Sequence, residues 1–387
     1  MDKFPNEKEL RIKAEELSKK ILIIDTHIDV PYRLQIDYED ISKKTNRGHF
    51  DYERAKEGGL DAVFMAVYIP ADFEQKGGGK KFAEGLISNV NEIIYKNPDK
   101  FSLASTAEEI KKNFRTDKIS VLFGMENGTG IENDLNNLEY FYKKGIRYIT
   151  LTHSKCNQIC DSSYDEERRW NGLSPFGEKV IAEMNKLGMI VDISHVSDSS
   201  FYDILKLSKA PVVATHSSCR HFTPDWERNM SDEMIKMLAE KNGIMMISFG
   251  SIFIDDEFRK RVDQTHKELV QFLKDKNIKY GDISARNLVD EYFKINNLKN
   301  VTIKQVADHI DHVKKLVGVD YLGLGSDFDG VRFTPRGLDD VSMYPNLIFE
   351  LLKRGYTEKE IEKICSKNFF RVWEEIEYVG KKLRKEI

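Results

Sequence analysis

The chain has 387 residues, of which 40% are hydrophobic and 32% charged; this is typical of a globular protein and excludes the disordered and fibrous classes. Its 60 basic and 64 acidic residues interleave along the sequence and leave a formal net charge of -4. Because this distribution provides no basic stripe for a phosphate backbone, we expect no nucleic-acid partner.

The first segment of the chain, residues 1–20, is highly charged and is predicted to form an N-terminal helical extension. It lacks the apolar core of a secretory signal peptide, and the sequence contains no apolar run that approaches bilayer length. We therefore expect a cytoplasmic protein with no membrane partner.

Short apolar runs rich in β-branched residues recur along the chain, and longer segments with helical spacing separate them. Such alternation is typical of a parallel sheet wrapped by helices, and continuous apolar runs indicate strands buried on both faces. Eight runs predict an α/β fold, a (β/α)8 TIM-type barrel, with a doubly wound open sheet as the alternative. The runs span residues 21–25, 60–69, 119–125, 146–152, 188–194, 211–215, 243–249 and 321–326.

Several of the expected helices begin at a Ser, Asp or Asn that can cap free backbone N–H groups. Examples of the expected helices are residues 135–144, 174–187, 198–208 and 232–241. Two stretches are predicted elaborations, a glycine- and lysine-rich loop at 70–82 and a helical insertion at 254–300. Residues 357–387 are expected to form a C-terminal helix, which leaves a single hydrolase barrel domain spanning residues 1–387.

Residues that can bind metal follow four of the predicted strands, at the end where catalytic groups gather in a barrel. The first run leads into His27 and Asp29, whose side chains point the same way because strand side chains alternate. The third run precedes Glu126, whose two oxygens can bridge two cations, the fifth His195 and the sixth His216. Each residue alone is more often structural, but random placement would scatter such residues among helices as well. Imidazole and carboxylate without thiolate favour zinc over manganese or cobalt, with enough ligands for two ions sharing one bridge.

Three further residues fit a substrate cleft beside these ligands. Asp327, after the eighth run, can pass a proton between metal-bound water and a leaving amine, although a turn-capping role is about as common. His153, after the fourth run, can donate a hydrogen bond to the oxyanion of a tetrahedral intermediate. Arg228 offers a planar fork that matches a carboxylate, but its residue type alone carries little weight.

The remaining histidines and the cysteines are assigned no catalytic role. Histidines in charged helical contexts are interpreted as structural: His266, His309 and His312. Two loop histidines stay ambiguous, with a surface position favoured: His49 and His221. The cysteines lack the spacing of a structural zinc site and the density of a disulfide scaffold, which predicts reduced thiols: Cys156, Cys160, Cys219 and Cys365.

Taken in order, the motifs of this chain resemble those of the membrane dipeptidase family, also called renal dipeptidases, within the metal-dependent amidohydrolase superfamily. The resemblance runs from about Ile21 to Arg371. The segments that carry it are IDTHIDVP, GHFDYERAKEGGLDAVFMAVY, GMEN, LTHS, VDISHVSD, ATHSSCRHF, RNMSD, DHIDHVKKLVGVDYLGLGSDFDG and KNFFRV.

This resemblance implies a barrel with two zinc ions, one held by His27 and Asp29, the other by His195 and His216. It also implies that Glu126 bridges the ions and that the substrate-cleft residues His153, Arg228 and Asp327 act in substrate binding and catalysis. The resemblance further implies a homodimer. It implies hydrolysis of dipeptides with free termini, often with a D-residue at the C-terminal position, by a hydroxide that the two metals activate. Some members of the family also open β-lactams.

Animal members of the family resemble secreted, lipid-anchored proteins, whereas this sequence shows neither their N-terminal signal nor their apolar tail, so we expect a soluble, microbial-type member. Two other functions stay open. One is a binuclear amidohydrolase acting on a cyclic amide, a lactone or a phosphoester, since a fold does not fix its substrate. The other is a barrel that binds peptides without catalysis, against which the full set of ligands and Asp327 argues.

Overall fold

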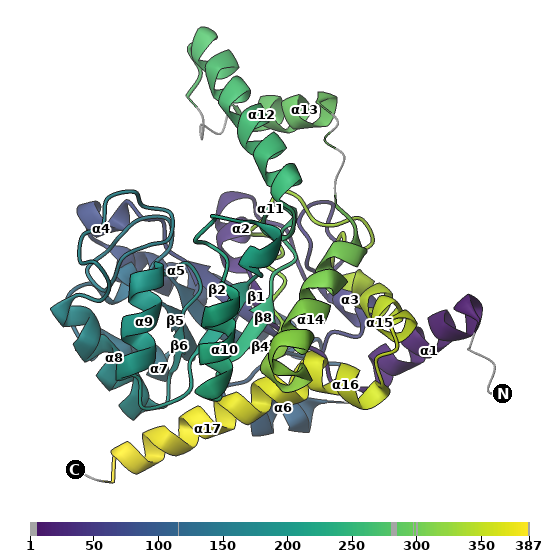
Figure 1. Cartoon of the computed structure of the whole chain (residues 1–387), viewed down its shortest axis with the longest axis horizontal. Coiled ribbons are helices and arrows are strands. Elements are labelled where there is room, and N and C mark those ends of the chain that lie inside the picture. Colours follow the sequence, from purple (N-terminus) through teal and green to yellow (C-terminus); the bar gives the residue numbers. More distant parts are fainter. Residues whose placement is uncertain (1–5, 115, 280–284, 297, 299–300, 386–387) are drawn as a thin grey trace.

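The computed structural model describes residues 6–114, 116–279, 285–296, 298 and 301–385, and its centre is a barrel of parallel strands (Figure 1). Neighbouring strands pair in the order β1-β2-β4-β5-β6-β7-β8-β9, and the short β3 pairs with the first residues of β4. The strands are β1 (Ile24–Ile28), β2 (Ala62–Tyr68), β3 (Phe101–Leu103), β4 (Ile119–Glu126), β5 (Ile146–Thr150), β6 (Ile190–Asp192), β7 (Val213–Ser217), β8 (Ile244–Ile247) and β9 (Leu322–Leu324).

The ring of strands is almost closed between β9 and β1. Ile28 forms a parallel bridge with Phe328, and the backbone N–H of Asp327 donates to the carbonyl oxygen of His27 over 3.0 Å. The TIM-type barrel expected from eight apolar runs is therefore confirmed, and the open-sheet alternative is wrong. The sequence did not predict β3, because only Phe101 of its three residues is buried and so short a segment shows no apolar run.

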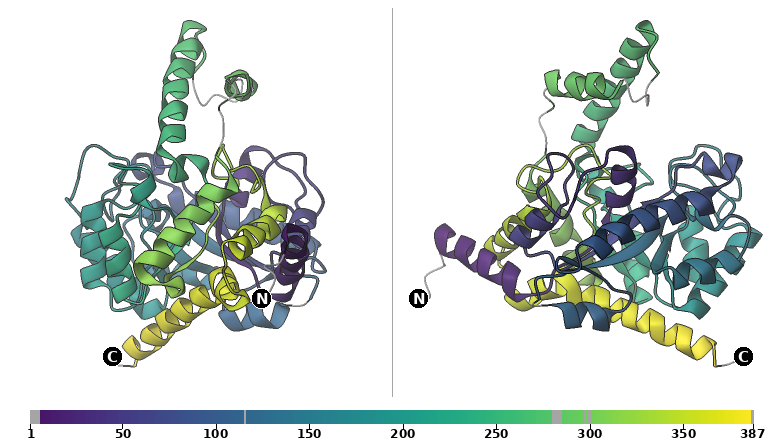
Figure 2. Two further views of the ribbon diagram at one scale, coloured as in Figure 1. Left: turned by 45° about the vertical axis from the view of Figure 1, so that its right-hand side comes forward. Right: turned by 180° about the vertical axis from the view of Figure 1, so that it is seen from behind.

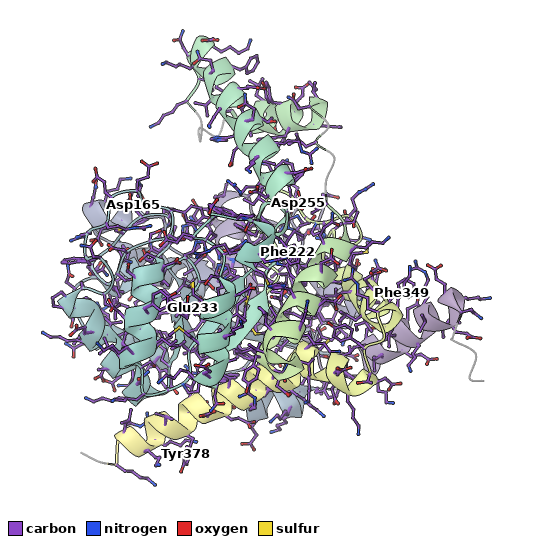
Figure 3. All side chains as sticks on the ribbon, viewed as in Figure 1. Asp165, Phe222, Glu233, Asp255, Phe349 and Tyr378 are labelled. Atoms are coloured by element: carbon purple, nitrogen blue, oxygen red, sulfur yellow. The ribbon has the colours of Figure 1, made fainter. Side chains whose placement is uncertain are left out.

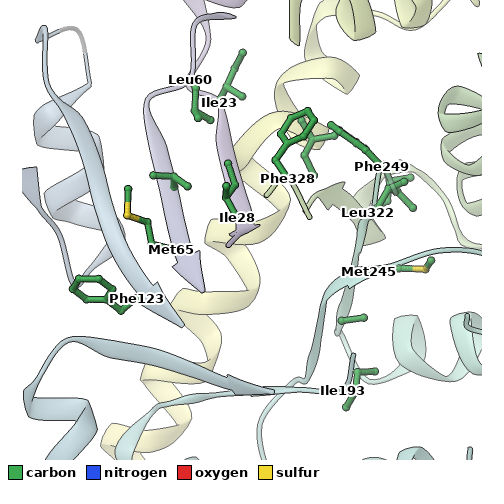
Figure 4. Close-up of a cluster of buried hydrophobic side chains, with 14 of the residues drawn as sticks. Ile23, Ile28, Leu60, Met65, Phe123, Ile193, Met245, Phe249, Leu322 and Phe328 are labelled. Atoms are coloured by element: carbon green, nitrogen blue, oxygen red, sulfur yellow. The ribbon is translucent and has the colours of Figure 1, made fainter. Parts of the chain in front are cut away.

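Helices surround the barrel and connect consecutive strands. Four helices expected from the sequence are confirmed as α7 (Asn136–Lys143), α8 (Pro175–Leu187), α9 (Asp198–Leu207) and α10 (Asp232–Glu240). The other helices on or beside the barrel are α2 (Val30–Ile36), α3 (Tyr52–Gly58), α4 (Phe73–Lys76), α5 (Gly79–Lys96), α6 (Ala107–Asn113), α11 (Ser251–Ile254), α14 (Ile303–Val317) and α15 (Tyr344–Lys353). Figure 4 shows side chains packed around the barrel strands, among them Met65, Phe123 and Met245.

The barrel is sealed at its N-terminal end by the last helix of the chain. After α16 (Glu358–Glu362) and a π-helical turn, α17 (Asn368–Leu383) runs across the bottom of the barrel in every view (Figures 1 and 2). Trp373 is fully buried there, and its ring centroid lies 5.8 Å from that of Phe64 on β2. Ile24, Leu122 and Tyr148 belong to the same apolar cluster, so this end of the barrel is closed to solvent.

Two elaborations lie outside the barrel. α1 (Glu7–Lys20) packs against α15, while α12 (Asp256–Asp275) and α13 (Arg286–Ile295) project from the end of the barrel opposite α17 (Figures 1 and 2). Parts of the expected segments 1–20, 254–300 and 357–387 lie outside the described residues, namely 1–5, 280–284, 297, 299–300 and 386–387. Across the described ranges, every helix is too short or too polar to cross a membrane.

Candidate metal centre

The ligands expected from the sequence meet at the C-terminal end of the barrel. His27 and His216 lie within β1 and β7, Glu126 is the last residue of β4, and Asp29 is the residue from which α2 begins. His195 lies three positions beyond β6 in a left-handed backbone conformation with φ of 66°. Non-glycine residues rarely adopt this conformation, which is strained and tends to occur at functional sites. The turn brings His195 beside the strand-borne ligands.

Glu126 stands at the centre of the group, with its two oxygens facing different residues. Oε1 lies 3.2 Å from Nε2 of His195 and 3.4 Å from Nε2 of His216, and Oε2 lies 3.7 Å from Nε2 of His27. On the His27 side, Nε2 of that residue is 3.3 Å from Oδ2 of Asp29. Because a carboxylate can bind one cation through each oxygen, this arrangement suits a bridge between two ions.

The ligand atoms also approach each other closely enough to share a cation. Nε2 of His195 lies 2.8 Å from Nε2 of His216. Three overlapping groups have ligand atoms within 4.8 Å of one another: His27 with Glu126 and His216, Glu126 with His153 and His195, and His27 with Asp29 and Asp327. The structure thus brings all five expected ligands together with His153 and Asp327.

Burying so many carboxylates without cations is unfavourable, and the pKa values reflect this. Burial, with the neighbouring Glu126, raises the pKa of Asp29 to about 6, and burial raises the pKa of Asp327 well above its ordinary value. Burial also lowers the pKa values of His195 and His216 well below the usual range, with help from nearby Arg228 and His27. His195 and His216 are therefore neutral, which is the protonation state in which an imidazole binds a divalent cation.

Among the buried atoms of the centre that have no hydrogen-bond partner, Nε2 of His27 tests whether the group fits a metal. Nε2 of His27 is fully buried, yet it makes no hydrogen bond within the described part of the chain. Nδ1 of the same ring lies 2.8 Å from the hydroxyl of Tyr148. Asp29 and Glu126 raise the pKa of His27 well above its ordinary value, so Nε2 faces two carboxylates at a position where a cation would take the place of a proton. The residues present therefore fit a metal ion.

A similar outer contact orients His216. Nδ1 of His216 lies 2.9 Å from the Thr215 hydroxyl, which donates to Oδ2 of Asp192 over 2.6 Å. Asp192 also accepts from the backbone N–H groups of Ser194 and Thr215, each over 2.9 Å. With its hydroxyl proton committed to Asp192, Thr215 can only accept from Nδ1–H, which leaves Nε2 of His216 unprotonated.

A cavity of about 430 Å³ opens over the ligand group. His153 and Asp327 both line it, next to the ligands Asp29, Glu126 and His195. Burial lowers the pKa of His153, so its ring is neutral and can still donate a hydrogen bond. Aromatic side chains form much of the remaining wall: Tyr32, Tyr68, Tyr164 and Phe253.

Arg228 lies behind this wall and is only 2% exposed. Its Nη1 donates to the Ser217 hydroxyl over 3.1 Å and its Nη2 donates to the carbonyl oxygen of His216 over 2.7 Å. Its guanidinium also lies 4.9 Å from the ring centroid of Phe253. Nε–H is buried and has no hydrogen-bond partner among the described residues.

The sequence reasoning missed several residues of this site. Arg33 and Asp329 line the cavity and form an ion pair of 3.0 Å between Nε and Oδ2. His49, for which a surface position was favoured, is partly buried and its Nδ1 accepts from the backbone N–H of Asp329 over 2.8 Å. Gly330 permits close packing, because a Cβ there would lie 2.3 Å from oxygens of both Asp29 and Asp327. The SDFDG segment is the sequence signal that points to Asp329 and Gly330 as well as to Asp327.

Comparison with known proteins adds independent information. Residues 11–386 match the family described as membrane dipeptidase (Peptidase family M19). Dipeptidase verJ of Clonostachys rogersoniana is 33% identical over 387 aligned residues, covering 96% of this chain and 88% of that protein. The structure of the probable dipeptidase PvdM from Pseudomonas aeruginosa aligns with a TM-score of 0.81 at 23% identity, covering 97% of this chain and all of that one.

A second solved structure is a metallo peptidase from Rhodobacter sphaeroides, liganded with a phosphinate mimic of the dipeptide L-Ala-D-Ala. It aligns with a TM-score of 0.74 at 24% identity and covers 92% of this chain and 99% of that chain. At this level of identity, both solved structures support the barrel fold.

Proposed function

Since this chain belongs to the membrane dipeptidase family and is a metal-dependent dipeptidase, we propose that it cleaves dipeptides with free termini at a centre of two zinc ions. The position of Glu126 carries this proposal. Its Oε1 faces His195 and His216, and its Oε2 faces His27. A single ion would leave one of these oxygens with no cation, whereas two ions use both.

In this proposal His27 and Asp29 hold one ion, His195 and His216 hold the other, and Glu126 holds both. When bound, a pair of zinc ions activates a water molecule for attack and polarises the scissile carbonyl. The absence of thiolate from the ligand set favours zinc over softer copper or iron–sulfur chemistry.

The residues around the ligands supply the proton transfer and part of the charge stabilisation. Asp327 lines the cavity and has a raised pKa, so it can hold a proton and pass it to the departing amine. His153, neutral and 3.5 Å from Oε1 of Glu126, donates to the oxyanion that forms on the scissile carbonyl. Both residues are catalytic in this scheme.

Arg228 is proposed to hold the C-terminal carboxylate of the dipeptide through its unused Nε–H. The guanidinium is already fixed by Ser217 and His216, so binding a carboxylate requires little further ordering. Arg33 is the rival for this role because it lines the cavity, but its charge is already balanced by Glu39 and Asp329. A cavity of about 430 Å³ fits a dipeptide better than a longer peptide.

A D-residue at the C-terminal position is part of the proposal, supported by the Rhodobacter sphaeroides structure with its L-Ala-D-Ala mimic. The test is a panel of L,L and L,D dipeptides assayed with purified protein of known metal content. The proposal expects two zinc ions per chain and turnover of both classes. A protein that hydrolyses cyclic amides, lactones or phosphoesters but no dipeptide would contradict it, as would one that binds dipeptides without turnover.

Replacing Arg228 by Met tests the carboxylate clamp. We expect kcat/KM for free dipeptides to fall by about 10²-fold, roughly 2.7 kcal/mol, with a much smaller loss for C-terminally amidated analogues. Arg11→Met, on the exposed α1, is the control and should leave both substrates unaffected. Equal losses on free and amidated substrates would contradict the clamp, and a selective loss in Arg33→Met would transfer the role to Arg33.

Assembly and location complete the proposal. We propose a cytoplasmic homodimer. All four cysteines are free thiols, which supports a reducing compartment such as the cytoplasm. Sedimentation equilibrium of the purified protein tests the dimer, and a monomer at micromolar concentration would contradict it.

A further inference from the structure

A second group of metal-binding side chains lies away from the barrel mouth. His221, Asp232 and His312 each offer one ligand atom, and these atoms lie within 4.8 Å of one another. His221 belongs to the 3-10 turn Arg220–Phe222, Asp232 is the first residue of α10, and His312 lies in α14. Their sequence neighbours Phe222 and Glu233 are labelled in Figure 3. The proposed dipeptidase activity uses none of the three.

The contacts within this group resemble a partly assembled coordination sphere. Nε2 of His312 lies 2.8 Å from Oδ1 of Asp232. The rings of His221 and His312 stack with centroids 4.3 Å apart and an interplanar angle of 20°. Ligand atoms around a tetrahedral zinc ion, each about 2.0–2.1 Å from the metal, are about 3.3 Å apart. Small side-chain rotations therefore suffice to complete three-point coordination.

An ion pair between His312 and Asp232 is the simpler explanation of the same contacts, but it accounts for only two of the residues. His221 is exposed, yet its ring stacks on that of His312. The ion pair alone gives the ring of His221 no polar partner in this group. Two neutral imidazoles and one carboxylate around a cation use all three side chains.

We propose that His221, Asp232 and His312 bind one divalent transition-metal ion, with zinc the best match to two imidazoles and a carboxylate, and that water completes its coordination. This site is additional to the metal centre in the barrel mouth and does not depend on how many ions that centre holds. The ligands come from one loop and two helices, so the ion would join three separate elements.

The position of this site suggests what the ion does. The loop between β7 and α10 carries Arg228; His221 lies in the first part of this loop, and Asp232 follows it as the first residue of α10. Bound to both, the ion would tie the two sides of this loop to α14. The loop is already attached near there, because the backbone N–H of Cys219 donates to Nδ1 of the buried His309 over 3.0 Å and Phe222 packs against the His309 ring. The ion would therefore hold in place the loop segment that carries Arg228.

The first experiment counts metal ions in the full-length enzyme. Protein loaded at the barrel mouth is titrated with Zn²⁺ by calorimetry, and the parent is compared with His221→Ala and His312→Ala. We expect each variant to bind one equivalent fewer than the parent. His266→Ala, a histidine on α12, should bind as many equivalents as the parent. Equal zinc binding by the parent and both variants would overturn the proposal.

A second measurement needs no variant and so remains valid if a substitution impairs folding. Diethyl pyrocarbonate modifies accessible imidazoles, and mass spectrometry locates each adduct. We expect added Zn²⁺ to slow modification of the exposed His221 by at least about tenfold, with no comparable effect on His266. Modification of His221 at the same rate with and without Zn²⁺ would overturn the proposal, whatever the activity of the enzyme.

Discussion

The two ends of the barrel are built on opposite principles. At the N-terminal end, Trp373 of α17 and its apolar neighbours cover the barrel interior, and burial of these side chains favours folding. At the C-terminal end, histidines and carboxylates such as Glu126 and Asp327 are buried almost as completely, although burial of charge opposes folding. The sealed end therefore stabilises the molecule. At the open end, burial of charged side chains opposes folding, and bound cations would offset this cost.

The largest effect is expected at the open end. Glu126→Gln keeps the shape of the side chain but removes the charge that faces both ligand groups. We expect kcat/KM for a dipeptide to fall by at least about 10³-fold, roughly 4 kcal/mol, together with loss of metal measured by elemental analysis. Glu178→Gln, on the exposed side of α8, should change neither quantity. Full activity and full metal content in Glu126→Gln would remove the bridging role.

The next effect concerns the sealed end and should separate stability from chemistry. Trp373→Ala empties the interface between α17 and the barrel and should cost about 3–5 kcal/mol of unfolding free energy. Denaturant unfolding measures this, while activity per folded molecule at low temperature stays near that of the parent.

Trp373→Phe is the matched control for the sealed end. It keeps an aromatic ring and removes an indole N–H that makes no hydrogen bond in the part of the chain described, so its loss should be much smaller. If Trp373→Ala abolished activity without changing stability, the proposed division between the two ends would be wrong.

A smaller effect is expected at Tyr148, which connects the two ends of the barrel. Its ring packs in the apolar cluster of the sealed end, and its hydroxyl contacts Nδ1 of His27. Tyr148→Phe leaves Nδ1 of His27 without its partner, and loss of such outer contacts typically weakens metal binding about 10–100-fold. Competition with a chelator measures this affinity. Tyr95→Phe, at a position 86% exposed, serves as the control. Unchanged zinc affinity in Tyr148→Phe would show that the hydroxyl does not orient His27.

The smallest effect is a dependence of stability on pH at the sealed end. Burial raises the pKa of Asp61 to about 7, although its carboxylate accepts a hydrogen bond of 3.0 Å from the Ile23 N–H. Because the folded state holds this proton more tightly than the unfolded state, the stabilisation is present at low pH and lost as pH rises through 7. Asp61→Asn should therefore gain stability over the parent between pH 5 and pH 8, by about 1–2 kcal/mol.

The control for Asp61 is Asp117→Asn, at an exposed position. Denaturant midpoints measured at each pH provide the comparison. A constant difference between Asp61→Asn and the parent across this range would contradict the raised pKa of Asp61.

The sequence revealed the open end better than the sealed one. Ligands such as His27 and His216 follow apolar runs, so their placement at one end of a barrel follows from strand direction alone. Tyr148 could not be assigned, because its role depends on Gly124 of the neighbouring β4, where a Cβ would lie 1.9 Å from the tyrosine ring. Arg33 and His49 belong to the cavity wall only through contacts with Asp329, far away in sequence.

The placement of α17 has a consequence for how this chain is made. Phe64 precedes Trp373, which covers it, by about 300 residues and is therefore synthesised long before it. Until then the floor of the barrel presents apolar side chains to water, and such surfaces promote aggregation of incomplete chains. Nascent chains stalled before α17 should therefore be clients of chaperones, and release from them should coincide with the emergence of α17 from the ribosome.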